Sequence, residues 1–284
     1  MRPRAGDAGA GLRLVDRSVA SQPASPAIAE RVTIGRVLSL SWHAWIACRW
    51  HLLLVVVPVS ALRAVGGYHL YAALPKLLPP AWKEMIGVWI TAGIHTPAIA
   101  CLAFAVVRWA AGQSMRPVDV LRTSWRRIPV VVIAALIVQT MDRGPALLIP
   151  ESSDLVFVVG YLAFVAYALG LGMVTFLLLP ILVVERTSVA GALDHSIDIM
   201  SGHRWRIVAL TLLIWVSLNL VTLVHFSWVR PWYPALSEEI FFAGRFVRTF
   251  LVISITSCIP AAAYYLLRSE KQGSSPDAVA RVFD

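Results

Sequence analysis

Polar side chains that interrupt apolar runs are the first candidates for chemistry in this 284-residue chain. His95 stands in one such run. Asn219, Thr222 and His225 recur at three-residue spacing in another, which places them on one helical face. Ionisable and polar groups at membrane depth are costly and often mark a substrate or proton path. Two interpretations stay open for these residues: hydrogen bonding between packed helices, or the lining of a cavity that a solute enters.

A second set of polar residues lies between the apolar runs. The Asp142–Arg143 pair ends one run and is typical of an anchor at a helix end. A further cluster of carboxylates and imidazoles comprises Glu185, Asp194, His195, Asp198 and His203. Metal ions need ligands that converge, and a linear cluster does not establish convergence. We therefore expect a solvated polar face here, with no metal and no cofactor.

Recognisable catalytic motifs do not occur in the sequence. It has no Walker A loop, no GxGxxG turn, no HExxH and no GxSxG. Its cysteines, Cys48, Cys101 and Cys258, are widely spaced and lie in or beside apolar runs, so we expect buried small hydrophobic side chains. These observations predict no catalytic residue and no enzymatic activity.

The elements that position these residues are predicted to be membrane-spanning helices. Hydrophobic residues make up 58% of the chain, charged residues 14%, and the mean hydropathy is +0.72. Soluble proteins carry about 25% charged residues, so an ordinary soluble enzyme is excluded. Five apolar runs reach the roughly 20 residues that cross a bilayer: 50–70, 86–107, 155–184, 207–229 and 250–267. A shorter sixth run falls within residues 127–150. The run 155–184 has 30 residues, so we expect this span either to be tilted or to extend beyond the hydrocarbon.

Charge distribution predicts the orientation. With six spans, eighteen of the 25 Lys and Arg residues fall on the side of the termini and seven on the other. The seven include Arg63 at the end of the first span, and Arg245 and Arg248 just before the last. The positive-inside rule then places both termini in the cytoplasm. We expect residues 1–30 to form a disordered cytoplasmic tail, 31–268 a six-helix transmembrane domain, and 269–284 a second cytoplasmic tail.

The partners expected on the cytoplasmic side are membrane lipids. Clustered arginines near a bilayer bind anionic headgroups, which accounts for the basic residues without nucleic acid. The candidate headgroup contacts are Arg122, Arg126, Arg127, Arg204 and Arg206.

An internal repeat precedes the first, third and fifth spans. A Leu is followed three residues later by a Ser at Leu38/Ser41, Leu121/Ser124 and Leu193/Ser196. Around these pairs the apolar residues recur at helical spacing, as in Ile34, Leu38, Trp42 and Trp45, which predicts short amphipathic helices in the interface. The second span of each unit carries one proline, either a packing kink or a hinge: Pro97, Pro180 and Pro260. The predicted fold is all-α, with three units of interfacial helix plus transmembrane hairpin.

The third repeat also supports a family resemblance. Val183-Val184-Glu185-Arg186, Ala192-Leu193-Asp194-His195-Ser196 and Gly202-His203-Arg204-Trp205-Arg206-Ile207 follow one another. This segment resembles the membrane domain of membrane-anchored glycerophosphodiester phosphodiesterases and related uncharacterised six-helix bacterial membrane proteins. The resemblance implies a location in the bacterial inner membrane. The phosphodiesterases carry a separate catalytic barrel that this chain lacks, so the resemblance transfers no catalytic residue.

Two functional hypotheses follow. A non-enzymatic module that organises lipids or partner proteins predicts a closed, apolar interior with polar groups paired at helix ends. A small transporter or permease component predicts a water-accessible cavity that converges on His95, Asn219 and His225.

Overall fold

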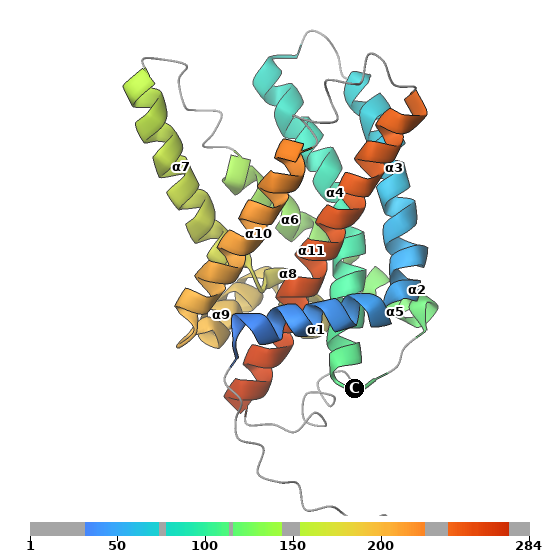
Figure 1. The fold of residues 1–284 in the computed structure, drawn as a ribbon, viewed down its shortest axis with the longest axis vertical. Coiled ribbons are helices and arrows are strands. Elements are labelled where there is room, and N and C mark those ends of the chain that lie inside the picture. Colours follow the sequence, from blue (N-terminus) through green and yellow to red (C-terminus); the bar gives the residue numbers. More distant parts are fainter. Residues whose placement is uncertain (1–31, 74–77, 114–115, 144–153, 225–237, 273–284) are drawn as a thin grey trace, which may run out of the picture. The chain divides into compact units, whose positions relative to one another are not determined.

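The computed structural model describes residues 32–73, 78–113, 116–143, 154–224 and 238–272. The chain divides into Met1–Glu30 and Arg31–Asp284, and the description below concerns the second unit. Every regular element in the described ranges is a helix, which confirms the all-α class (Figure 1). The predicted N-terminal tail and the part of the predicted C-terminal tail beyond residue 272 lie outside the described residues. The end of the sixth apolar run, 144–150, and His225 also lie outside them.

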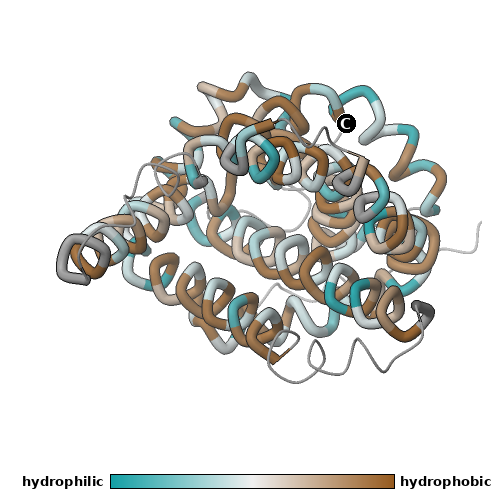
Figure 2. Tube along the Cα trace, turned by 90° about the horizontal axis from the view of Figure 1, so that it is seen from above, coloured by the Kyte–Doolittle hydropathy of each residue, from teal (hydrophilic) through white to brown (hydrophobic). Residues whose placement is uncertain are grey.

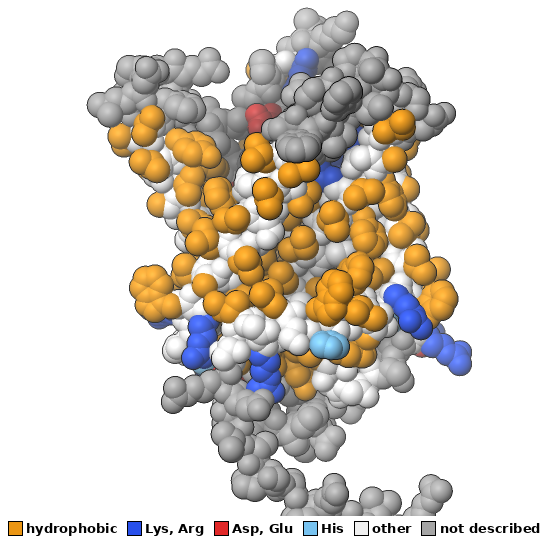
Figure 3. Space-filling view, viewed as in Figure 1, with side chains coloured by type: hydrophobic (Ala, Val, Ile, Leu, Met, Phe, Trp, Pro, Cys, Tyr) orange, Lys and Arg blue, Asp and Glu red, His pale blue; other side chains and the backbone are white. Residues whose placement is uncertain are grey.

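Five helical segments are long and apolar enough to cross a membrane, in agreement with a multi-pass membrane protein. The first segment joins α2 (Arg49–His51), η1 (Leu52–Val56) and α3 (Val57–Ala72). The others are α4 (Pro80–Ala110), α7 with α8 (Asp154–Thr175 and Leu178–Val184), α10 (Arg204–Val224) and α11 (Glu238–Gln272). Large apolar side chains are exposed along these segments, and Figure 3 shows them as a belt with several Lys and Arg side chains along its lower edge. Such a belt is typical of a surface that faces lipid.

The third predicted span corresponds to α6 (Ile128–Arg143). Its 16 residues extend about 24 Å at 1.5 Å per residue, less than the hydrocarbon thickness of about 30 Å. The helix packs along α4, where the indole Nε1 of Trp89 donates to Thr140 Oγ1 at 2.9 Å. Within the described residues α6 is therefore a short apolar helix beside five longer segments.

Two prolines explain two irregularities in the long segments. The π-helical turn η1 precedes Pro58, and residues 176–177 separate α7 from α8 just before Pro180. A proline has no N–H to donate to the carbonyl four residues earlier, so the helix widens or breaks there. The apolar run 155–184 still corresponds to one candidate span, Val158–Val184, which is interrupted at residues 176–177. Pro97 and Pro260 instead lie inside the continuous helices α4 and α11.

Three short helices precede α2, α6 and α10: α1 (Ile34–Ala47), α5 (Pro117–Trp125) and α9 (Val189–Met200). Figure 1 shows α1 lying across the longer helices, and it packs on α4 and α11. Each short helix buries its repeat serine together with a small residue four positions earlier: Val37/Ser41, Val120/Ser124 and Ala192/Ser196. The apolar face predicted for α1 includes Trp42, which is 60% exposed. The buried face of α1 lies beside it and carries Val37 and Ser41.

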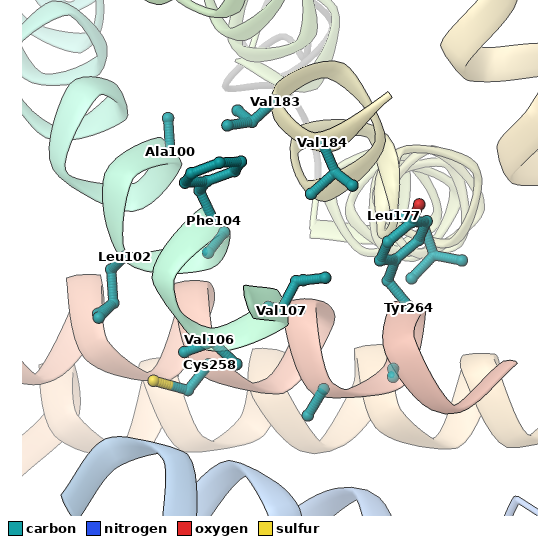
Figure 4. Packing of buried hydrophobic residues seen from close by; sticks show 14 of the residues in the cluster. Ala100, Leu102, Phe104, Val106, Val107, Leu177, Val183, Val184, Cys258 and Tyr264 are labelled. Atoms are coloured by element: carbon teal, nitrogen blue, oxygen red, sulfur yellow. The ribbon is translucent and has the colours of Figure 1, made fainter. Parts of the chain in front are cut away.

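Close packing is concentrated where α4, α8 and α11 meet. Phe104 and Tyr264 are the largest fully buried side chains. Figure 4 shows Phe104 directed toward Val183 and Tyr264 beside Leu177. Figure 2 shows hydrophobic residues along nearly every described helix, on outward as well as inward faces. All three cysteines are free and buried in this packing, which confirms the expectation for them.

Candidate functional site

A cavity of about 940 Å³ lies between α3, α4, α6, α7, α8, α10 and α11. His95 of α4 and Asn219 and Thr222 of α10 line it, so the tertiary structure brings together three of the four polar residues singled out in the apolar runs. A volume near 1,000 Å³ is at the upper end of the range for small-molecule sites. The interior of the described helices thus holds space for a solute.

The cavity runs along about two thirds of α4 and nearly half of α11. On α4 its lining extends from Glu84 to Ala103, about 28 Å of helix at 1.5 Å per residue. On α11 it extends from Arg245 to Pro260, about 22 Å. These lengths approach the hydrocarbon thickness of a bilayer, about 30 Å.

Charged residues line one end of this cavity. Arg63, Arg245 and Arg248 lie there with the carboxylates of Glu84 and Asp142. Neighbouring spans run in opposite directions, so the start of α4, the end of α6 and the start of α11 meet at this end. The three arginines are half-buried. Arg63 is within electrostatic range of the other two.

The sequence did not single out these arginines as site residues. The last span was expected to begin at Phe250, but α11 begins twelve residues earlier, at Glu238. Arg245 and Arg248 therefore lie inside a helix rather than in a loop. Arg63 likewise lies nine residues before the end of α3 and lines the cavity. The three-residue spacing of Arg245 and Arg248, which puts both on one helical face, was the available signal.

Hydrogen bonding differs among the polar residues of the cavity wall. The Asn219 side chain donates to the Trp215 carbonyl of its own helix at 2.7 Å. Thr222 Oγ1 accepts from Nη2 of Arg248 at 3.2 Å and so links α10 to α11. His95 Nε2 and Thr211 Oγ1 are buried without a hydrogen-bond partner in the described part of the chain. Buried polar atoms nearly always have a protein or water partner, so these two atoms mark where water or a ligand is needed.

A buried polar network lies on α8 and α11 a few residues beyond Pro180 and Pro260, the last residues of these helices that line the cavity. The carboxylate of Glu185 accepts from Tyr264 Oη and from Arg268 Nη1, each at 2.6 Å, and also contacts Nδ1 of His195. Arg268 Nη1 donates to Tyr264 Oη as well. The side chains of Glu185 and Arg268 are each 8% exposed. Through these contacts the network joins the C-terminal end of α8 and His195 of α9 to α11.

The solvated polar face expected over residues 185–203 is therefore wrong for Glu185, because α11 covers it. Asp198 does lie on an exposed face, where Lys271 pairs with it at 2.5 Å. A hydrogen bond from the Lys271 ammonium holds the pKa of the Asp198 carboxyl below its usual range. Across the described ranges no group of three or more His, Cys, Asp or Glu side chains is placed to hold a metal ion.

The five arginines expected at lipid headgroups differ in exposure. Arg122, Arg126 and Arg204 are exposed, and Arg127 and Arg206 are half-buried. Nη1 of Arg206 lies 3.0 Å from Nδ1 of His203. Contact of these five residues with headgroups stays a prediction.

The sequence and fold match no known family model, no curated protein and no solved structure. The resemblance to the phosphodiesterase membrane domains remains a hypothesis that rests on the motifs quoted above.

Proposed function

We propose that this chain binds a polar solute inside the membrane and passes it across, as a small transporter or permease component. The observation that carries the proposal is the 940 Å³ cavity, whose lining combines His95, Asn219 and three arginines. Polar and ionisable groups inside a membrane protein commonly line a water-filled path. A module that only organises lipids or partner proteins needs no such cavity and favours a closed, apolar interior. The proposed role is binding and passage, without bond chemistry.

The proposed topology has six spans with both termini in the cytoplasm of a bacterium, and α6 as the start of the third span. The excess of Lys and Arg in the loops on the side of the termini supports this orientation. The buried serines of α1, α5 and α9 support three units of interfacial helix plus hairpin, since each serine occupies the same position of its unit. The exposed arginines of α5 and α10 would then meet anionic headgroups.

Passage requires the packed end of the cavity to open. Pro180 of α8 and Pro260 of α11 line the cavity next to this end. The break at residues 176–177 supplies a point at which α8 can move relative to α7. The ion pair of Glu185 with Arg268 connects α8 to α11 and would hold this end closed. Its rupture is the step that we assign to opening.

Cysteine accessibility tests the proposal. Asn219→Cys places a thiol in the cavity, whereas Leu220→Cys places one on the adjacent outward face, where Leu220 is 57% exposed. Charged methanethiosulfonate reagents react quickly only with thiols that contact water. In proteoliposomes we expect the Asn219→Cys variant to react and the Leu220→Cys variant to stay unlabelled, while the three buried native cysteines give the background. Equal labelling of the two variants would overturn the proposal.

A further inference from the structure

The arginine cluster at one end of the cavity identifies a class of ligand, on the basis of the proposed function. We propose that Arg63, Arg245 and Arg248 bind the phosphate or carboxylate group of an amphiphile whose apolar part lies along the cavity wall. Each step of the inference rests on the lining of the cavity and on the positions of these residues in their helices.

The first step is charge. Among the described residues of the lining, three guanidinium groups stand against two carboxylates, those of Glu84 and Asp142, so these residues carry a positive excess. Arg63 is close enough to Arg245 and Arg248 to be acted on by their charges. Like charges gathered away from bulk water repel one another strongly, and a bound anion relieves that repulsion.

The second step is the position within each helix. Arg245 and Arg248 lie seven and ten residues after the start of α11, about 10–15 Å from that helix end. Arg63 lies nine residues before the end of α3, a similar distance from its end. An arginine that interacts only with a helix end lies in the terminal turn. These three side chains instead line the interior space.

The third step is the geometry of the donors. A guanidinium has five N–H donors in a planar fork that matches the oxygens of a phosphate or carboxylate. The bond from Arg248 Nη2 to Thr222 uses one of these donors and fixes the side chain against α10. Asn219, one turn before Thr222, adds an amide to the same wall.

The fourth step is the contrast between the two parts of the cavity. The walls from α7 and α10 are mostly apolar and carry Thr175 and Thr211 beside the apolar side chains of Phe164, Val165, Leu169, Ile214 and Leu218. Burial of apolar atoms against such a wall is favourable, whereas a free inorganic anion gains nothing from it. An anionic group attached to a hydrocarbon chain fits both parts.

Equilibrium binding of radiolabelled dodecyl phosphate to the full chain in phosphatidylcholine nanodiscs tests this inference. We expect saturable binding that is weakened at least tenfold in each of Arg63→Gln, Arg245→Gln and Arg248→Gln. The matched control is Arg116→Gln, which removes the same charge from an exposed position just before α5 and outside the cavity, and which should bind as the wild type does. If Arg248→Gln binds as tightly as Arg116→Gln, the inference is overturned.

Competition experiments distinguish an anionic amphiphile from free inorganic phosphate as the ligand. Unlabelled dodecyl phosphate should displace the probe, whereas inorganic phosphate and dodecanol at equal concentration should not. Displacement by inorganic phosphate as effective as that by dodecyl phosphate would overturn the assignment to an amphiphile. The Arg248→Lys variant keeps the charge while removing the fork, so it should fold as the wild type does and bind at intermediate strength. Affinity equal to the wild type would contradict the role of the fork.

Failure of this inference is distinguishable from failure of the proposed function. If the Asn219→Cys variant is labelled and dodecyl phosphate does not bind, the cavity stands and the ligand class is wrong. If the same variant is not labelled, the cavity is not accessible to water and the proposed function is wrong.

Discussion

Loss of the Arg268 guanidinium should destabilise this protein far more than loss of an exposed cation on the same helix. Arg268 is 8% exposed and donates to the Glu185 carboxylate at 2.6 Å. The Arg268→Gln change leaves that carboxylate buried, with only Tyr264 and His195 as partners. Removal of one partner of a buried ion pair costs about 3–5 kcal/mol. Because two partners remain for Glu185, we expect a loss near 3 kcal/mol.

The assay is unfolding by SDS in mixed micelles, followed by the far-ultraviolet circular dichroism of the helices. Lys271→Gln is the matched control, since Lys271 lies on the same helix but its pair with Asp198 is exposed. Exposed pairs contribute little, so the control should unfold as the wild type does. The double change of Glu185 and Arg268 to Gln should cost less than the sum of the two single changes, because no lone buried charge remains. Equal stability of the Arg268→Gln and Lys271→Gln variants would refute the buried ion pair.

Three further outcomes are expected. Phe104→Ala removes a fully buried ring and should lower the free energy of unfolding by about 3–5 kcal/mol in the same assay. Trp42→Ala, at a position 60% exposed, should lower it much less. The reverse order would contradict the packing described above. Ser196→Ala removes the bond from Ser196 Oγ to the Val174 carbonyl at 3.1 Å and should cost about 0.5–1.5 kcal/mol, and a more stable variant would show that this bond does not form. The proposed topology has six spans and both termini in the cytoplasm, so green fluorescent protein fused at either terminus should fluoresce in bacteria and alkaline phosphatase fused there should be inactive. Opposite results at the two termini would indicate an odd number of spans.

The apolar runs were sufficient to predict the long helices, because the hydropathy and length of a run are properties of adjacent residues. The all-α class and the segments around 50–70, 86–107 and 207–224 follow from them. Proline positions were also informative, since the missing N–H acts on the carbonyl four residues earlier in the same helix. The break before Pro180 could therefore have been predicted from the sequence, although we predicted only the span in which it lies.

The surroundings of several charged residues were not predicted from the sequence. Arg245 and Arg248 were expected to lie outside the membrane because a charged residue marks the end of an apolar run. In the structure α11 includes both residues, and their side chains line the cavity. Glu185 was expected to be solvated, but Tyr264 and Arg268 of α11, 79 and 83 positions away in the chain, contact and cover it.

By itself, the sequence determined that this chain forms apolar helices and placed His95 and Asn219 within them. Only the tertiary structure decided that these residues share a cavity with three arginines, and that a buried ion pair joins α8 to α11 beyond the other end of that cavity. The physical reason is that hydropathy adds up along the chain, whereas a cavity or a buried pair depends on which faces of distant helices meet.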